Sequence, residues 1–238
     1  ASDVYKRQII ASTATKYADW TLQLCKKVLR YLCGTVETGL RFPAGGDASE
    51  LLTWSDAGYG GVGTKSQTGV LIAWGGAVVT WRSSRQATSA LSTCEAEVAA
   101  AAMAFQITEG LRFLLEEWGV RFQPTVLYID NKSALLLGEN GGTWRTRYFA
   151  VRAARIQQEN TVGNLVLKYC PTAVMAADAL TKMGNALILG DLRNAMNANL
   201  PEVKDTVAIK ATDDSWWAAH PLHGLCERAP HIASARTL

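Results

Sequence analysis

The sequence has little that would mark a secreted, disulfide-bonded or membrane-spanning protein. Among its 238 residues are five cysteines, an odd number without close paired spacing, which argues against a disulfide scaffold or a zinc site. No apolar run approaches the roughly 20 residues that span a bilayer, and the first residues lack the apolar core of a signal peptide. We therefore expect reduced thiols, an intracellular protein and no membrane partner.

The sequence also lacks a large excess of either positive or negative charge. The net charge is +3, so no global electrostatic field indicates nucleic acid, and any basic surface must be local. Hydrophobic residues make up 48% of the chain and charged residues 19%, which is typical of a globular protein and not of a disordered one. The length accommodates one well-packed domain with extensions.

Apolar periodicity and turn residues predict a mixed α/β layer. The two β-rich runs on either side of Gly75-Gly76 indicate a hairpin, and the proline-free, alanine-rich run that follows indicates a long helix. The expected strands are 51–56, 68–74, 77–82, 125–130 and 164–170, and the expected helices are 15–33, 93–118, 132–138, 145–159 and 174–182. This order predicts an antiparallel portion built from the first three strands and a parallel portion built from the last two.

The predicted elements divide the chain into four segments. Residues 1–14 are a poorly defined N-terminal segment, and 15–47 form a helix and turn that lead into the domain. Residues 48–183 form the α/β domain, and 184–238 form a C-terminal extension that we expect to be partly disordered. The three histidines of this extension match no metal-site spacing, so an ordinary tail is the preferred interpretation.

Four acidic residues stand at the ends or starts of these elements. Asp56 and Asp130 each end an apolar strand, Glu95 opens the long helix, and Asp178 lies in the last helix. Carboxylates held together tolerate one another only when cations neutralise them, so this order suits a divalent-metal nuclease. Each acid also has an ordinary interpretation: Asp56 as a turn residue, Asp130 as a helix cap, and Asp178 as an exposed helix residue.

The long helix carries two glutamates whose helical phase distinguishes them. Glu95 and Glu97 are two positions apart, so they point to opposite faces of the helix. Glu95 lies one turn before Ala99, the first residue of the apolar stripe on this helix. Glu95 is therefore predicted to face the sheet and Glu97 the solvent. The ordinary alternative is that Glu95 forms a capping box with Ser92. The stripe comprises Ala99, Met103, Ile107, Gly110 and Leu114.

Seven runs, in order, carry a family resemblance that extends from about Trp20 to Lys182. They are Trp54-Ser-Asp-Ala-Gly-Tyr-Gly-Gly, Ser66-Gln-Thr-Gly-Val, Val79-Thr-Trp-Arg-Ser-Ser-Arg-Gln, Ala90-Leu-Ser-Thr-Cys-Glu-Ala-Glu, Tyr128-Ile-Asp-Asn-Lys-Ser-Ala, Arg145-Thr-Arg-Tyr and Ala177-Asp-Ala-Leu-Thr-Lys. Together they resemble the ribonuclease H domain of copia-type retrotransposon Pol polyproteins. Residues 15–47 resemble the segment that links reverse transcriptase to this domain. Departures from the family pattern at Gly58, Cys94, Val98, Tyr148 and Ala150 indicate a drifted copy.

The resemblance implies a ribonuclease-H-like fold and cleavage of the RNA strand of RNA–DNA hybrids by two Mg²⁺ ions, with Mn²⁺ as a possible substitute. It implies that Asp56 bridges both ions, that Glu95 and Asp130 complete the leaving-group ion, and that Asp178 holds the ion that activates water. Products would carry a 5′-phosphate and a 3′-hydroxyl. The implied setting is the cytoplasm, in retrotransposon particles, with the reverse transcriptase region of the same polyprotein as a partner.

Hybrids are recognised by backbone shape and the 2′-hydroxyl, so polar and basic residues near the hairpin and the strand ends are candidate substrate contacts. They are Lys65, Ser66, Gln67, Arg82, Ser83, Ser84, Arg85, Gln86, Asn131, Arg145 and Arg147. Two other classes stay open. One is a catalytically degenerate module that binds nucleic acid or a polymerase. The other is an integrase or transposase, which the position of Glu95 before Asp130 disfavours.

Overall fold

A mixed five-stranded sheet organises the computed structural model, which describes residues 10, 18–37, 39–61, 64–140, 147–182, 192, 194–196 and 200. The strands are β1 (Leu51–Gly58), β2 (Gln67–Trp74), β3 (Ala77–Arg85), β4 (Thr125–Ile129) and β5 (Leu165–Tyr169). They lie in the order β3-β2-β1-β4-β5. The pairs β1–β2 and β2–β3 are antiparallel, and β1–β4 and β4–β5 are parallel. The sheet predicted from the sequence is confirmed.

The β2–β3 hairpin closes at the predicted glycine pair. Gly75 and Gly76 have φ angles of 57° and 80°, a region that side chains other than glycine rarely adopt. A turn with positive φ at both central residues matches the right-handed twist of the flanking strands, which explains the position of the hairpin.

The parallel pairing of β1 with β4 brings two of the predicted acids together. Ser55 is the register partner of Ile129, so Asp56, near the end of β1, and Asp130, the first residue after β4, lie side by side. Parallel strands end at the same edge, and ligands of α/β sheets bind outside such carboxyl ends.

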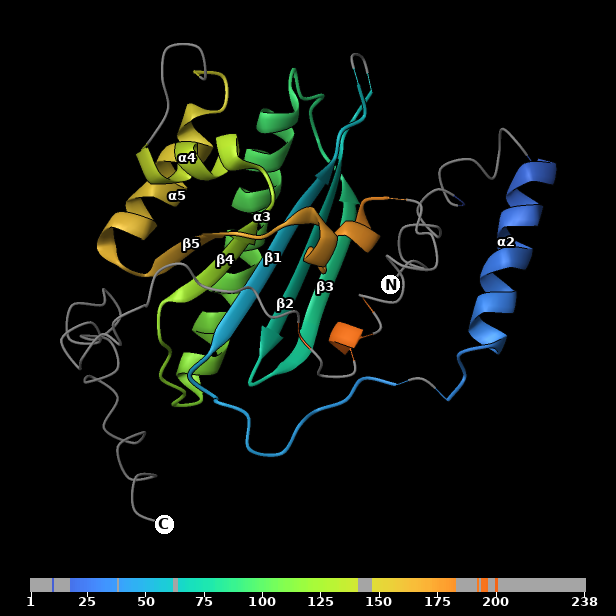
Figure 1. Cartoon of the computed structure of the whole chain (residues 1–238), viewed down its shortest axis with the longest axis horizontal. Helices are drawn as coiled ribbons and strands as arrows, with labels where there is room; N and C mark the ends of the chain where they lie inside the picture. Colours follow the sequence, from blue (N-terminus) through green and yellow to red (C-terminus); the bar gives the residue numbers. More distant parts are fainter. Residues whose placement is uncertain are drawn as a thin grey trace. The chain divides into compact units, whose positions relative to one another are not determined.

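Helices α3 (Thr93–Glu117), α4 (Lys132–Asn140) and α5 (Ala150–Val162) pack together with one another and with the sheet. In Figure 1, α3 runs behind the strands, while the short helical turns η2 (Thr172–Val174) and η3 (Asp178–Leu180) lie in front of them. A further helix, α2 (Ala18–Cys33), coincides with the described part of the predicted 15–33 helix. The predicted segment boundaries at 14, 47 and 183 stay predictions.

One predicted helix is wrong. Residues 174–182 form no α-helix but parts of two 3₁₀ turns, η2 and η3, joined by a turn. The segment packs closely on the sheet: a Cβ on Gly69 would lie 2.8 Å from the carbonyl oxygen of Ala177. Backbone contact at this distance favours a flat strap over a helical cylinder, whose side chains would hold its axis away from the sheet.

Both faces of the sheet are buried. Toward α3, side chains such as Val70, Ile72 and Leu127 pack against Ala101 and Phe105. On the opposite face the core forms around Trp54, Leu71 and Tyr128, where Trp54 and Tyr128 stack with ring centroids 5.3 Å apart. That second core also contains Met175, Ala177, Leu180, Leu192 and Ala195. A strap and a helical layer therefore enclose the central strands between them.

By length and composition α3 is apolar enough to cross a bilayer. In the structure, however, it packs along β1 and β2 and holds Glu97, Thr108 and Arg112 out of solvent. Thr108 forms a hydrogen bond of 2.9 Å with Thr53 of β1. These contacts identify α3 as the core helix of the domain.

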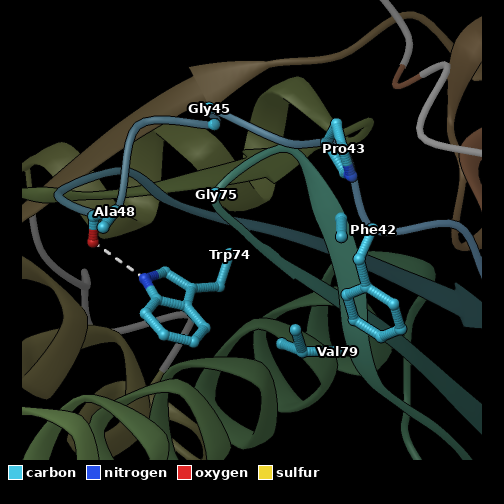
Figure 2. Close-up of a pocket in the computed structure, with 9 residues that line it drawn as sticks. Phe42, Pro43, Gly45, Ala48, Trp74, Gly75 and Val79 are labelled. Carbon is cyan, nitrogen blue, oxygen red and sulfur yellow. Dashed lines mark hydrogen bonds between the residues drawn. The ribbon is translucent and has the colours of Figure 1, made fainter.

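An apolar pocket of about 290 Å³ lies at the hairpin end of β2 and β3, as Figure 2 shows. Phe42, Pro43, Trp74 and Val79 contribute side chains to it, and the Trp74 indole nitrogen donates to the carbonyl of Ala48. Trp74 pairs with the first residue of β1, whereas Asp56 lies near the end of that strand. The pocket is therefore at the opposite end of β1 from the acidic residues.

Candidate metal centre

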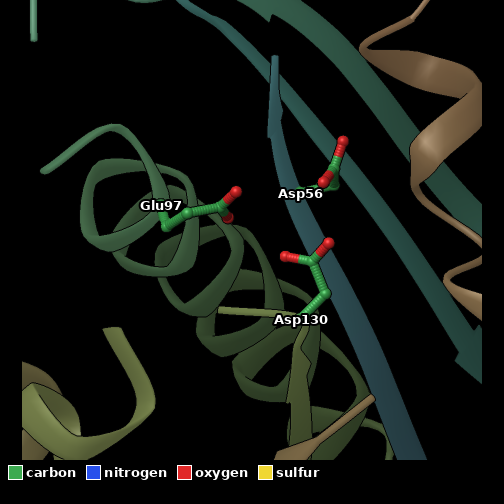
Figure 3. A group of neighbouring side chains, drawn as sticks. All are labelled: Asp56, Glu97 and Asp130. Carbon is green, nitrogen blue, oxygen red and sulfur yellow. The ribbon is translucent and has the colours of Figure 1, made fainter. Parts of the chain in front are cut away.

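Three carboxylates converge near the carboxyl ends of β1 and β4. Asp56, Glu97 and Asp130 each offer an oxygen atom, and these atoms all lie within 4.8 Å of one another. Figure 3 shows Glu97 reaching from α3 toward the two aspartates of the neighbouring strands. A set of three carboxylate oxygens at this spacing can coordinate a hard divalent cation.

The environment of Asp56 disfavours its charge. Burial raises the pKa of Asp56 to about 6, the hydrogen bond from the Thr181 hydroxyl lowers it, and the charge of Asp130 raises it further. Asp130 is less buried, and its pKa is also raised, first by burial; the Thr172 hydroxyl, which donates to its Oδ2 over 3.1 Å, opposes this shift. A carboxyl group with a raised pKa loses its proton readily when a nearby cation compensates the resulting negative charge.

Glu97 has the strongest requirement for a cation. It is 6% exposed, and burial, followed by the charges of Asp56 and Asp130, raises its pKa to about 9. The backbone N–H of Ala57 donates to this carboxyl group, yet Oε2 has no hydrogen-bond partner among the described residues. A buried carboxylate oxygen without a partner is costly, and the carboxylate that carries it belongs to the group of three converging acids.

The two glutamates of α3 have exchanged the environments predicted for them. Glu97, not Glu95, faces the sheet, so the predicted orientation of both residues is wrong. The Glu95 carboxylate accepts the backbone N–H of Leu91 over 2.8 Å, and Ser92 Oγ accepts the N–H of Glu95 over 3.1 Å. These bonds resemble a capping box, the alternative that the sequence also offered, with the carboxylate accepting from Leu91, the residue before the cap, and not from Ser92.

The apolar stripe predicted for α3 is not the face that the helix buries. Gly110 and Leu114, which belong to the predicted stripe, are exposed. The buried face consists largely of small residues, which let α3 approach the sheet closely. A stripe at spacings of three and four residues through these positions would have identified Glu97. The buried positions are Ala96, Glu97, Val98, Ala100, Ala101, Ala104, Phe105, Thr108, Arg112 and Leu115.

Asp178 lies beside the three-carboxylate group but outside it. Its side chain is buried at the start of η3 and forms an ion pair with Lys182. Its charge raises the pKa values of both Asp56 and Asp130, so it is within electrostatic reach of them. Burial lowers the pKa of Lys182, but the hydrogen bond to Asp178 and the charges of Asp56, Asp178 and Asp130 raise it above its ordinary value.

The residues predicted to contact the substrate differ in how far their side chains are exposed to solvent. Lys65, Arg82, Arg85 and Arg147 are exposed, and Arg147 stacks on the Tyr148 ring, 4.9 Å from its centroid. Gln67, Ser84 and Asn131 are half-buried; Asn131 accepts the N–H of Ala134 and caps α4. Arg145 lies outside the described residues.

Three of the candidates are structural, so their prediction as surface contacts is wrong. Ser66, Ser83 and Gln86 are buried. Ser66 Oγ accepts the N–H of Gly60, and Ser83 donates to the carbonyl of Leu180. Gln86 donates to the carbonyl of Ala96 and thereby ties the end of β3 to the first turns of α3. Polar residues in these runs stabilise the loops around the acids from within.

Comparison with known proteins gives one consistent set of sequence relatives. The chain is 35% identical over 161 residues to the retrovirus-related Pol polyprotein from transposon TNT 1-94 of Nicotiana tabacum, covering 66% of this chain and 12% of that protein. It is 32% identical over 165 residues to the Pol polyprotein from transposon RE1 of Arabidopsis thaliana, covering 68% and 11%. The transposon Ty1-NL2 Gag-Pol polyprotein of Saccharomyces cerevisiae is 30% identical over 137 residues, covering 56% and 8%. The chain thus spans about a tenth of the length of these relatives.

No family model matches the chain. Among solved structures, it is similar to LC11-RNase H1 from compost, at 18% identity and a TM-score of 0.45, over 56% of this chain and 92% of that one. It is also similar to RNase H1 from Halobacterium salinarum, at 18% identity and a TM-score of 0.42, over 60% and 98%. At these TM-scores the fold assignment depends on the strand order and pairing described above.

Proposed function

We propose, on the premise that the chain belongs to the ribonuclease-H-like segments of retrotransposon Pol polyproteins, that it hydrolyses the RNA strand of RNA–DNA hybrids with two Mg²⁺ ions. The observation that carries the proposal is the convergence of Asp56, Glu97 and Asp130, with oxygen atoms within 4.8 Å, at the carboxyl ends of two parallel strands.

The residues present fit a hard divalent cation. All three converging groups are carboxylates, which Mg²⁺ and Mn²⁺ prefer over softer ligands. The unpartnered oxygen of Glu97 and the raised pKa values of Glu97 and Asp56 indicate a site whose negative charge needs compensation. The set Asp56, Glu97 and Asp130 would hold one ion, and Asp178 with Asp56 would hold the second.

When bound, two cations lower the pKa of an attacking water and neutralise the charge that develops on the leaving oxygen. The chain itself orients the ligands. Thr181 and Thr172 donate hydrogen bonds to Asp56 and Asp130, and the capping box of Ser92 and Glu95 fixes the start of the helix that carries Glu97. Glu95 therefore acts in this proposal as a positioning residue and not as a ligand.

The substrate contacts would come from the exposed cations near the sheet edge. Lys65, Arg82 and Arg85 belong to β3 or to the loop before β2, and Arg147 precedes α5. Arginine and lysine bind phosphates without reading bases, which suits recognition of a hybrid by its backbone and 2′-hydroxyls. A related solved structure is LC11-RNase H1 in complex with an RNA/DNA hybrid.

The polyprotein setting is part of the proposal. The chain spans about a tenth of relatives that are Pol polyproteins, so its partner would be the reverse transcriptase region of the same polyprotein. The corresponding location is the cytoplasm, within retrotransposon particles.

The test is a cleavage assay on 5′-labelled RNA, free or annealed to DNA or RNA. We expect Mg²⁺-dependent cleavage of the hybrid alone, loss of cleavage in EDTA, and products with a 5′-phosphate and a 3′-hydroxyl. The Asp56→Asn variant serves as the inactive control. Hybrid binding without cleavage at any Mg²⁺ or Mn²⁺ concentration would contradict the proposal and identify a degenerate binding module.

A further inference from the structure

Lys182 places a positive charge among the acids of the candidate metal centre. Its ammonium group forms an ion pair with Asp178, four residues earlier. The charges of Asp56 and Asp130 raise the pKa of the same ammonium group. The charge of Lys182 in turn lowers the pKa of Glu97. One ammonium group therefore interacts with all four carboxylates that surround this end of the sheet.

The backbone that carries Lys182 is firmly attached to the sheet. The N–H groups of Thr181 and Lys182 both donate to the carbonyl of Asp178, and the Thr181 hydroxyl donates to Asp56. Ser83 of β3 donates to the carbonyl of Leu180. The Cα of Lys182 thus has a defined position, and only the side chain is free to move toward the acids or away from them.

The exposure of the two partners differs. The Asp178 side chain is 8% exposed and the Lys182 side chain 43% exposed. A half-exposed lysine can withdraw into solvent at small cost, since it is strongly hydrated and flexible. The buried carboxylate that it leaves behind must gain another cation.

We propose that the Lys182 ammonium competes with a divalent cation for the Asp178 carboxylate, and so sets how strongly that cation binds. This proposal rests on the proposed function for the identity of the cation. Lys182 partly compensates the repulsion among the carboxylates, and it withdraws when a divalent cation takes Asp178 as a ligand. Lys182 is thus a positioning residue that regulates occupancy of the centre.

The consequence is a pair of opposite effects when the charge of Lys182 is removed. Without the ammonium, the acids repel one another without local compensation, so the metal-free protein becomes less stable. Without the ammonium, a divalent cation also has no competitor for the Asp178 carboxylate, so its affinity for the site rises. Because the lysine is half-exposed, we expect the Mg²⁺ dissociation constant to fall severalfold and by no more than about tenfold.

The experiment is calorimetric titration of Mg²⁺ into the full chain, with thermal unfolding of the metal-free protein as a second measurement. Lys182→Met should bind Mg²⁺ more tightly than wild type and unfold at a lower temperature without metal. Lys182→Arg keeps the charge and should bind close to wild type. Lys132→Met is the matched control, because Lys132 lies two residues after Asp130 but contacts the Tyr169 ring, 5.2 Å from its centroid.

Equal or weaker Mg²⁺ binding by Lys182→Met, with wild type and control binding normally, would overturn the competition and leave the proposed function intact. Absence of Mg²⁺ and Mn²⁺ binding in the wild type would overturn the metal centre itself and the competition with it. If Lys182→Met does not fold, Lys182→Gln replaces it, since a neutral amide can still donate to Asp178; tighter Mg²⁺ binding is expected there too.

Discussion

At the scale of single residues, the two neighbouring glutamates of α3, Glu95 and Glu97, have different roles. Glu97 enters the carboxylate group with a buried, unpartnered oxygen, whereas Glu95 closes a capping box with Ser92. Two positions on an α-helix differ by roughly 200°, so only one of the pair can reach the sheet. The chemistry of the site depends on which one it is.

We expect Glu95→Ala to lower stability without removing the metal centre. The variant loses the bond from the Leu91 N–H to the carboxylate, and loss of such a hydrogen bond costs about 0.5–1.5 kcal/mol. Urea unfolding measures the loss, and calorimetric titration with Mg²⁺ measures the site. A variant as stable as wild type but unable to bind Mg²⁺ would contradict the assignment of Glu95 to the cap.

The raised pKa of Glu97 predicts a pH-dependent stability of the metal-free protein. Its pKa is about 9 in the folded state against an ordinary value of 4.5, so between these values the folded protein holds a proton that the unfolded chain releases. Stability therefore falls as the pH rises through this window, with a slope of at most about 1.4 kcal/mol per pH unit. Asp56 adds a change of the same sign between 3.8 and about 6.

The measurement is urea unfolding in EDTA at about pH 6 and about pH 8. Wild type should lose stability across this interval, and Glu97→Gln, which cannot ionise, should lose much less. Parallel curves for the two proteins would show that Glu97 is charged throughout and that its pKa is not raised.

At the scale of elements, the strap of residues 171–182 fixes one side of the site. Gly69 of β2 allows its close approach, because a Cβ there would lie 2.8 Å from both the Ala177 carbonyl oxygen and Thr181 Cγ2. The strap carries Thr172, Asp178 and Thr181, which contact or act on Asp56 and Asp130. Its distance from the sheet therefore controls the arrangement of the acids.

We expect Gly69→Ala to destabilise the protein by about 1–3 kcal/mol, the usual cost of overpacking, and to weaken Mg²⁺ binding. The matched control is Gly110→Ala, an exposed helical glycine whose Cβ would meet nothing within 4 Å. That variant should gain roughly 0.5–1 kcal/mol. Thermal unfolding and Mg²⁺ titration of both variants check the pair; unchanged Mg²⁺ binding in Gly69→Ala would show that the strap does not position the acids.

Local signals explain which elements could be predicted from the sequence. The strands around Gly75-Gly76 and the position of Asp130 at the end of β4 follow from apolar runs and turn residues, and the structure confirms them, whereas β1 continues two residues beyond Asp56, to Gly58. The phase of α3 was assigned wrongly because its buried face carries polar residues such as Thr108 and Arg112 among small ones, so the run of larger apolar residues on another face gave the stronger signal.

Tertiary contacts explain the remaining differences. Ser66, Ser83 and Gln86 are polar and lie in a run rich in basic residues, so the sequence favoured a surface role. In the folded chain Gly60, Leu180 and Ala96 supply their hydrogen-bond partners; Leu180 is 97 residues from Ser83, whereas Gly60 and Ala96 are 6 and 10 residues from Ser66 and Gln86. The strap replaced the predicted 174–182 helix for a similar reason, since the approach at Gly69 outweighs local helix propensity.

At the scale of the whole molecule, the fold gathers like charges that oppose folding. Asp56, Glu97 and Asp130 come from two strands and a helix, so their repulsion arises only when the sheet and α3 are assembled. A cation that binds only the folded state returns stability in proportion to the logarithm of its concentration.

We expect Mg²⁺ to stabilise the protein by about 2.7 kcal/mol at a hundredfold excess over its dissociation constant. Asp130→Asn should be modestly more stable than wild type without metal and respond less to Mg²⁺, because it removes one repelling charge and one ligand. Thermal unfolding of both proteins with and without Mg²⁺ checks this. A metal-free Asp130→Asn less stable than wild type would assign Asp130 a purely structural role.

The most direct test of the proposed metal centre is Mg²⁺-dependent cleavage of a labelled RNA–DNA hybrid by wild type, Glu97→Gln and Glu95→Gln. Glutamine keeps the shape of both side chains, and a capping box accepts it. We expect Glu97→Gln to lose cleavage, because a neutral amide is a poor ligand for a hard cation, and Glu95→Gln to retain most of it. Retained cleavage in Glu97→Gln, or its loss in Glu95→Gln alone, would contradict the metal centre described for Asp56, Glu97 and Asp130.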